Sequence, residues 1–348
     1  MWQFISRRLG LMVLTTLCLS FIVFFLTNLQ PNLVKLAKTE AGIRMTDDQV
    51  ISWLDDRGYN QPLLLRYGEW LGVVPGYVHT NKDGETRGRC ISHNVEDTPT
   101  YCGLLQGSLG NSTIFNVSVG QALSTRLGLT GILMFWVMIV MIPMALIIGI
   151  LAGMREGSKA DRTLSTIAIG FTATPEYISG VILSVIFASR IVFDDRLLLP
   201  SSQAAMENMT FSNFALPVMT MVLYGMGYIA RMTRASMAEV MTAQYVRTAR
   251  LKGVSFPSIV LKHALRNALI APFTVIMLQF PWLLTGVVIV ETLFNYKGFG
   301  WLLVMAADGN DVELLLSCSL VAVLVVLVTQ LISDIGYVFL NPRIRVSS

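Results

Sequence analysis

The chain has 348 residues, of which 53% are hydrophobic and only 14% are charged, with a formal net charge of +4. Soluble domains carry about 25% charged residues, so this composition excludes an ordinary soluble enzyme or binding domain. The charge is also uneven, because "YVRTARLKGVSFPSIVLKHALRNAL" (245–269) places six basic side chains, counting His263, between two long apolar runs.

Six apolar runs are long enough to cross the hydrocarbon core, which takes about 20 helical residues. A chain in lipid must satisfy its own backbone hydrogen bonds, so runs of this length predict helices. We expect spans at 9–29, 127–154, 163–189, 211–230, 267–290 and 314–340. The sequence therefore predicts an all-α integral membrane protein with six transmembrane helices. The first run is longer than a signal-peptide core and no Ala-x-Ala site follows it, which favours a retained anchor.

These spans predict three parts of the chain. Residues 1–30 hold the N-terminal start and first helix, 31–120 form an external segment, and 121–348 form a five-helix core that includes the loop 239–266. In the external segment, Thr46 precedes two acids and begins an amphipathic stretch, which predicts a small cap of short helices. The polar insertion 74–103 contains Cys90 and Cys102, and a disulfide and two free thiols are both open there.

The loop charges predict the orientation. The side that holds both termini carries 14 Lys and Arg residues and three acids, whereas the other side carries 12 Lys and Arg residues and 17 acids. Cytoplasmic loops are enriched in Lys and Arg, so both termini and the loop 239–266 are expected in the cytoplasm. The expected location is the bacterial cytoplasmic (inner) membrane.

Two acids fall within the expected spans, where charge is costly and normally faces protein or water. Glu176 follows Pro175, which we expect to interrupt a helix, as we do Pro143. Glu176 is either a pore-lining acid or a structural hydrogen-bonding or subunit contact, and the structural reading is favoured. Asp334 lies near the end of the last span, where an ion pair with Arg343 or Arg345 is expected.

Several kinds of chemistry have no signature in this sequence. There is no G-x-x-x-x-G-K-[ST] phosphate loop, and His79, His93 and His263 are too scattered to suggest a metal site. No hydrolase motif is present. We therefore expect no catalytic residue, metal site or cofactor in this chain.

The basic loop is expected to form two helices around a tight turn. Residues 238–252 form the first, with apolar contacts from residues that include Leu251, and Gly253 ends it in a left-handed conformation. Ser255 then caps the second helix, with Pro257 in its first turn. A basic helix can lie on anionic lipid or in a groove of a partner protein, and the defined turn favours a partner protein.

The loop resembles the "EAA" motif (E-A-A-x-x-x-G, nine residues, I-x-L-P) of membrane subunits of bacterial ABC importers. Arg247-Thr248-Ala249 stands at the leading positions, Gly253 at the glycine, and residues 263–266 at the close. The segments "YVRTARLKG" and "HALRNAL" are similar to the corresponding sequences of the dipeptide, oligopeptide and nickel permease family. "RMTRASMAEVM", "VVIVETLFNYKGFGWLLV", "DIGYVFLNPRIR" and "NQPLLLRYGEWL" extend the resemblance over most of the chain.

The resemblance implies a type I ABC importer permease fold and a role as a transport subunit rather than an enzyme. The implied partners are a second homologous permease subunit, two ATP-binding cassette subunits that hold ATP and Mg, and a periplasmic substrate-binding protein. The implied cargo is a di- or oligopeptide or a related small solute. The implied ATPase-docking residues are Tyr245, Arg247, Thr248, Ala249, Arg250, Lys252 and Gly253.

Two other functions remain as alternatives. A self-sufficient secondary carrier or channel would transport without ATPase partners, and a membrane scaffold would move no substrate. The sequence departs from the family at Lys297, where proline is common, and in the insertion 74–103. These departures lie on the external side, outside the basic loop, and they concern the identity of the substrate and of the binding protein.

Overall fold

The computed structural model describes residues 2–42, 44–80, 86–91, 99–188 and 210–340. Arg343 and Arg345, the expected partners of Asp334, lie outside the described residues, as do His93 and the end of the expected span 163–189. The chain divides into two compact units. Unit 1 comprises Met1–Leu127 and Leu302–Leu324, and unit 2 comprises Gly128–Trp301 and Val325–Ser348.

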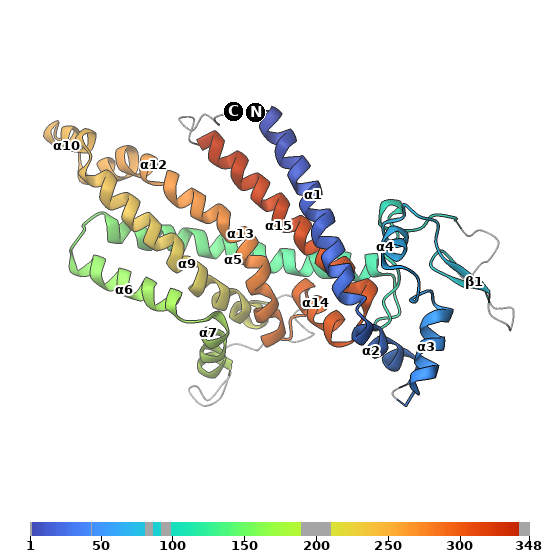
Figure 1. Ribbon diagram of the computed structural model, residues 1–348. Coiled ribbons are helices and arrows are strands. Elements are labelled where there is room, and N and C mark those ends of the chain that lie inside the picture. Colours follow the sequence, from blue (N-terminus) through green and yellow to red (C-terminus); the bar gives the residue numbers. More distant parts are fainter. Residues whose placement is uncertain (1, 43, 81–85, 92–98, 189–209, 341–348) are drawn as a thin grey trace. The chain divides into compact units, whose positions relative to one another are not determined.

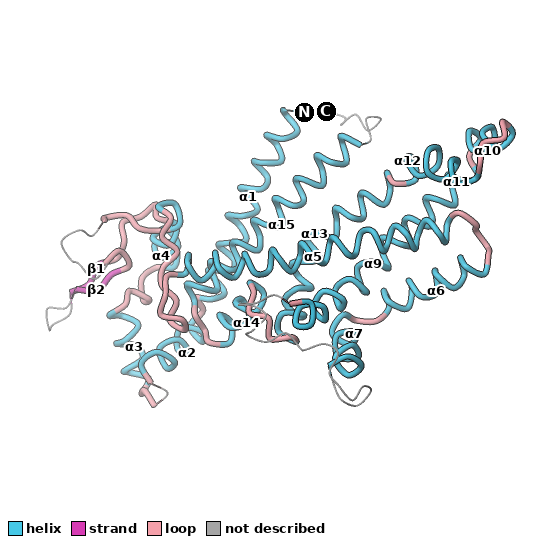
Figure 2. Tube along the Cα trace, turned by 180° about the vertical axis from the view of Figure 1, so that it is seen from behind, coloured by secondary structure: helices cyan, strands magenta, loops and turns pink. Residues whose placement is uncertain are grey.

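Most of the described chain is helical (Figures 1 and 2). The helices are α1 (Trp2–Thr27), α2 (Gln30–Ala41), α3 (Asp47–Asp56), α4 (Leu63–Leu71), α5 (Val119–Gly153), α6 (Lys159–Ala173), α7 (Glu176–Leu183), α9 (Phe211–Thr242), α10 (Gln244–Leu251), α11 (Phe256–Ser258), α12 (Leu265–Ala268), α13 (Ile270–Leu293), α14 (Phe299–Asp308) and α15 (Val312–Leu340). Two π-helical segments (Ser184–Ala188, Ile259–Ala264) and a 3-10 turn (Leu104–Gln106) accompany them. The strands β1 (Val78–Thr80) and β2 (Thr86–Gly88) form an antiparallel hairpin within the insertion.

The prediction of a helical multi-pass membrane protein is confirmed. The predicted number of six spans is reached only if two bent helix pairs are each counted as one span. Four single helices are long and apolar enough to cross a membrane, in α1, α5, α9 and α15. Two bent helix pairs raise the count to six if each pair is one span. The described part of the chain thus holds four to six candidate spans.

Proline has different effects at the two positions where a break is expected. α6 ends at Ala173, Pro175 precedes α7, and the two helices meet at 103°, as the sequence predicts for this stretch. The expected interruption at Pro143 is wrong, because α5 continues through it from Val119 to Gly153. A single proline removes one backbone donor, and the long apolar run on both sides keeps the helix continuous.

Unit 1 packs α2, α3 and α4 around the end of α1 and the start of α15. The expected helix start at Thr46 is confirmed by a capping box, in which Thr46 and Gln49 exchange side-chain to backbone hydrogen bonds. Asp311 is fully buried before α15, where its carboxylate accepts from Ser112 Oγ at 2.6 Å and from the Leu314 backbone N–H at 3.1 Å. A buried carboxylate thus begins the last long helix, in keeping with the preference of helix N-termini for acids.

Unit 2 is organised around α9, which packs against α6, α7 and α13. α5 approaches α9 at Gly149 and Gly153, a small-x-x-x-small pair of the kind that allows close contact between membrane helices. A Cβ at either glycine would lie 2.6 Å from a backbone carbonyl oxygen of α9, that of Ala230 or that of Arg234. These two glycines therefore set the distance between the helices.

A buried acid fixes the connection from α13 to α14. Glu291 is fully buried and accepts hydrogen bonds from Thr130 Oγ1 and, at 3.0 Å, from the Trp301 backbone N–H. Thr130 Oγ1 accepts in turn from the Phe299 backbone N–H at 2.7 Å. The uncharged run that predicts the fifth span ends at Val290, so the pattern gives no sign that Glu291 is buried.

Candidate functional site

The basic loop begins where α9 ends. α9 continues to Thr242, Ala243 is extended with φ −63° and ψ 148°, and α10 starts at Gln244 (Figure 1). The expected single helix over 238–252 is therefore wrong, since its first turn belongs to α9. Ala243 is neither proline nor glycine, so residue type gave no signal for this break.

α10 has one buried face and one exposed face. Val246 and Ala249 are buried against Ile259, with Val254 beside them. Among the expected docking residues, Ala249 is thus turned inward and packs in the small core of the loop. The other six expected residues are exposed, namely Tyr245, Arg247, Thr248, Arg250, Lys252 and Gly253.

Leu251 differs from its expected environment. The sequence predicts that Leu251 makes apolar contacts within the loop, but the structure leaves 82% of it exposed. It lies five residues after Val246, and at about 3.6 residues per turn this places it far from the buried stripe. Leu261, also 64% exposed, adds a second large apolar side chain to the surface of the loop.

The turn after α10 has the predicted glycine geometry. Gly253 has φ +77°, and the Val254 backbone N–H donates to the Ala249 carbonyl at 3.2 Å. Ser255 stands at the N-cap position with Pro257 in the first turn, as expected, but its side chain makes no capping hydrogen bond. The stop at Gly253 is confirmed, and the capping role of Ser255 is wrong.

The loop is attached to the body of unit 2 at several points. Asn267 Nδ2 donates to the Tyr245 hydroxyl at 3.0 Å, and Ser236 Oγ donates to the Ala268 carbonyl at 2.8 Å. The Arg155 guanidinium lies 5.7 Å from the centre of the Phe256 ring, a cation–π distance. α10 and the segment after it are therefore held against α9 and the end of α5.

An ion pair joins α6 to α9 beside this loop. Arg234 donates to the Asp161 carboxylate through Nε at 2.9 Å and Nη2 at 2.8 Å, and Asp161 is 3% exposed. The carboxylate also accepts from the Gly157 backbone N–H and from Ser165 Oγ. This ion pair was not predictable from the sequence, because no local pattern pairs residues 73 positions apart.

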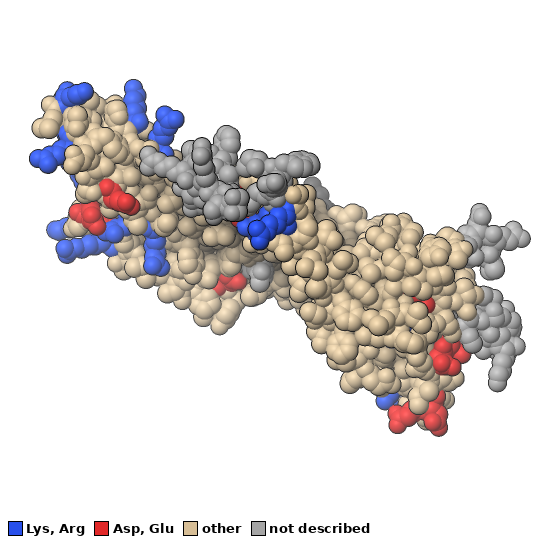
Figure 3. Space-filling view, turned by 45° about the horizontal axis from the view of Figure 1, so that its top comes forward, with Lys and Arg blue, Asp and Glu red and all other residues tan. Residues whose placement is uncertain are grey.

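Basic side chains gather at the end of unit 2 that carries α10 (Figure 3). The exposed Lys and Arg residues there are Arg155, Lys159, Arg162, Arg231, Arg247, Arg250, Lys252, Lys262 and Arg266. The bases of the loop itself make, with Leu251 and Leu261, a surface that is both cationic and apolar, namely Arg247, Arg250, Lys252, Lys262 and Arg266. Such a surface suits insertion into a complementary protein groove.

The other singled-out residues lie apart from this loop in the sequence. Glu176 begins α7 and Asp334 lies in α15, and both are half-buried. Cys90 and Cys102 are joined by a disulfide with a Cα–Cα distance of 5.4 Å. Among the described residues, no group of three or more His, Cys, Asp and Glu side chains could hold a metal ion.

Comparison with known proteins decides the family. The profile of the "Binding-protein-dependent transport system inner membrane component" family matches residues 145–346. The chain belongs to this family. It is similar to a "Probable peptide ABC transporter permease protein" of Sinorhizobium fredii, with 31% identity over 99% of this chain and 100% of the relative.

Other relatives of this inner membrane component carry a different cargo in their names. A "Glutathione transport system permease protein" of Pectobacterium atrosepticum is 32% identical over 98% of both chains. The protein of the same name from Salmonella typhimurium is 31% identical over 99% of both. The chain is thus an ABC transporter permease with apolar membrane helices, and it is related along its whole length to transport subunits.

Proposed function

We propose that this chain is one of two homologous permease subunits of an ATP-driven importer for di- or oligopeptides or related small solutes. The two subunits together form the translocation path. Two ATP-binding cassette subunits bind ATP and Mg and dock on the loop 239–266, and a periplasmic binding protein delivers the cargo. Both termini and α10 lie on the cytoplasmic side. The names of the relatives support peptide-type cargo.

The observation that carries this proposal is the combination of exposure and anchoring in α10. Its outer face presents Arg247, Arg250 and Leu251 to solvent, whereas its inner face is fixed by Val246 and Ala249. Leu251 is 82% exposed, and burying this apolar side chain against a partner would be favourable. This exposure therefore favours a docked helix over one that stays in solvent. A docking groove with acidic walls and an apolar floor would complement this face.

The attachments of α10 give the docking a mechanical consequence. A partner that displaces α10 also moves Ile259 through packing and residue 267 through the Tyr245 hydroxyl. Ser236 then links this segment to α9, which packs against α6, α7 and α13. Closure of the two ATPases would thereby rearrange the helices that border the path. The chain supplies the lever, and its partners supply the nucleotide energy.

The test is charge reversal on the exposed face. We expect Arg247→Glu with Arg250→Glu to lower ATP-dependent uptake at least tenfold in proteoliposomes with all partners present. ATP hydrolysis should persist but lose its stimulation by the binding protein. Lys159→Glu with Arg162→Glu, exposed bases on α6, is the matched control and should retain most uptake. Normal transport by the α10 variant would refute the assignment of this site.

A further inference from the structure

Unit 1 contains a polar cavity of about 330 Å³. It lies among the end of α1, the helices α2 to α4, the end of β2 and the start of α15. Its walls carry acids and bases together, namely Glu40, Asp56, Glu69 and Glu313 with Arg57, Arg66 and Arg89. This volume is within the range of small-molecule sites.

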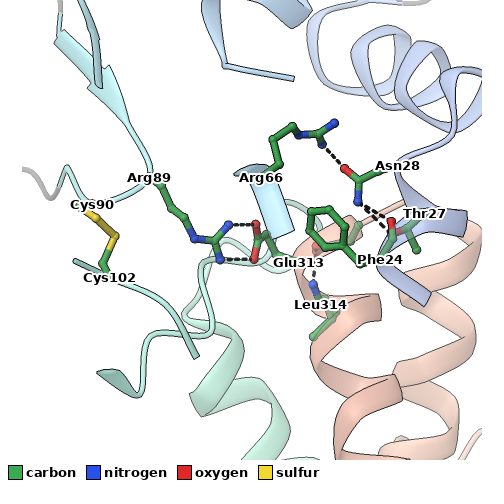
Figure 4. Close-up of polar contacts among 10 residues, drawn as sticks. Phe24, Thr27, Asn28, Arg66, Arg89, Cys90, Cys102, Glu313 and Leu314 are labelled. Atoms are coloured by element: carbon green, nitrogen blue, oxygen red, sulfur yellow. Dashed lines mark hydrogen bonds and ion pairs between the residues drawn. A yellow bond between two sulfur atoms is a disulfide. The ribbon is translucent and has the colours of Figure 1, made fainter. Parts of the chain in front are cut away.

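Arg66 is a buried cation whose direct partners are neutral. It is 9% exposed, Nη1 donates to the Tyr59 carbonyl at 3.0 Å, and Nη2 donates to Asn28 Oδ1 (Figure 4). Its guanidinium also lies 4.8 Å from the Tyr59 ring centre and 5.9 Å from that of Phe24. Within the described part of the chain, no carboxylate lies at ion-pair distance from it.

Burial of a charge without an ion pair is unfavourable, and here burial lowers the pKa of Arg66. A guanidinium has five N–H donors, of which these contacts use two. Arg66 lines the cavity, so its three remaining N–H donors are available at the cavity wall. Arg66 is therefore prepared to receive an anionic group.

Arg89 shows the contrasting case in the same cavity. Its two Nη atoms donate to the two carboxylate oxygens of Glu313 at 2.7 and 3.0 Å (Figure 4). This bidentate pair neutralises both charges. Arg89 comes directly before Cys90, whose disulfide to Cys102 restrains this wall. The Arg89–Glu313 pair is thus a structural element. Of these two arginines, Arg66 is the one whose charge is available to a ligand.

Negative charge without an ion pair is present as well. Glu69 and Glu40 line the cavity, with Glu69 half-buried and Glu40 exposed. Partial burial raises the pKa of each carboxyl, and it outweighs the attraction of Arg89 and Arg66 for Glu69 and of Arg57 for Glu40. Neither carboxylate lies within ion-pair distance of a described cation. One cavity therefore holds a buried guanidinium and two carboxylates that do not neutralise one another by contact.

We propose that this cavity binds a small zwitterion that carries one carboxylate and one ammonium group, as a free amino acid or short peptide does. Arg66 binds the carboxylate between the Tyr59 and Phe24 rings, and Glu69 and Glu40 face the ammonium group. This inference rests on the proposed function, because it assigns the cavity to the same class of cargo.

The experiment uses the complete transporter without its binding protein, in lipid nanodiscs, with binding followed by calorimetry. The ligands are L-alanyl-L-alanine, its N-acetyl derivative and its C-terminal amide. We expect L-alanyl-L-alanine to bind, and each blocked derivative to bind at least tenfold more weakly. Arg66→Gln should weaken L-alanyl-L-alanine at least tenfold and leave the amide unchanged. Arg44→Gln, an exposed arginine outside this cavity, is the control and should bind normally.

If the Arg66→Gln variant fails to assemble, the three ligands are still compared on the unaltered protein, and their relative affinities decide the test. Glu69→Gln provides a second variant. Glu69→Gln should weaken L-alanyl-L-alanine and leave the N-acetyl derivative unchanged. No binding to the unaltered complex, or equal binding by the Arg66→Gln variant, would overturn the inference. After the calorimetry, the binding protein is added to the same nanodiscs and ATP hydrolysis is measured, and an absence of stimulation would count against the proposed function instead.

Discussion

At the scale of single residues, Gly253 controls the turn after α10 through its backbone alone. Its φ is +77°, and a Cβ there would meet nothing within 4 Å. An L-residue in this conformation costs about 1–2 kcal/mol, least for Asn. We expect Gly253→Val to displace α10 and reduce uptake, whereas Gly253→Asn retains most of it. Equal uptake by the two variants would show that the conformation is not needed.

The Asp161–Arg234 pair makes a prediction about stability. Removal of one member of a buried ion pair typically costs about 3–5 kcal/mol, because it leaves an uncompensated charge. The partial exposure of Arg234 favours the lower end of this range. Arg234→Gln should lower the unfolding temperature of the purified subunit, and Asp161→Asn with Arg234→Gln should recover part of the loss. Arg231→Gln, an exposed arginine on the same helix, is the control and should change it little.

Residue-level predictions from sequence succeed where the residue type restricts the backbone. Gly253 and Thr46 were predictable because a left-handed turn and a helix N-cap each favour few residue types. Leu251 and Ala249 depend on which way α10 faces, which the break at Ala243 decides. Arg66 and Asp161 depend on contacts between distant segments, which no local pattern reveals.

At the scale of helices, Gly149 and Gly153 allow α5 to approach α9. We expect Gly149→Leu or Gly153→Leu to prevent this packing and to cause loss of folded subunit in the membrane. Gly128 and Gly131 lie on the same helix, where a Cβ would meet nothing within 4 Å. Gly131→Leu is therefore a matched control that should accumulate normally, as measured by yield and monodispersity in detergent. Normal accumulation of the Gly153→Leu variant would contradict the packing argument.

The helices themselves were largely predictable because lipid forces long apolar runs to satisfy their own hydrogen bonds. The 103° bend before α7 was foreseeable from Pro175. The continuity of α5 through Pro143 was not, since a proline has the same local chemistry in both places. The separate helix α14 was also missed, because its short run of ten residues follows the Glu291 connection and cannot span a membrane.

At the scale of the whole molecule, composition established a membrane protein, and the loop motif pointed to the family that the comparisons then showed. The candidate docking face was largely predictable, because it is one short segment of sequence. The cavity around Arg66 was not, since its walls come from α1 to α4, β2 and α15. Local motifs reveal sites of the first kind, and sites of the second kind require the fold.

The most direct test of an ATP-driven role measures uptake of a labelled dipeptide into proteoliposomes with this chain alone and with its complete set of partners. We expect no uptake by the chain alone. With both permease subunits, the ATPases and the binding protein, uptake should require ATP and cease when α10 carries Arg247→Glu and Arg250→Glu. Uptake by the chain alone, or uptake indifferent to ATP, would contradict the claim that energy enters this protein through its basic loop.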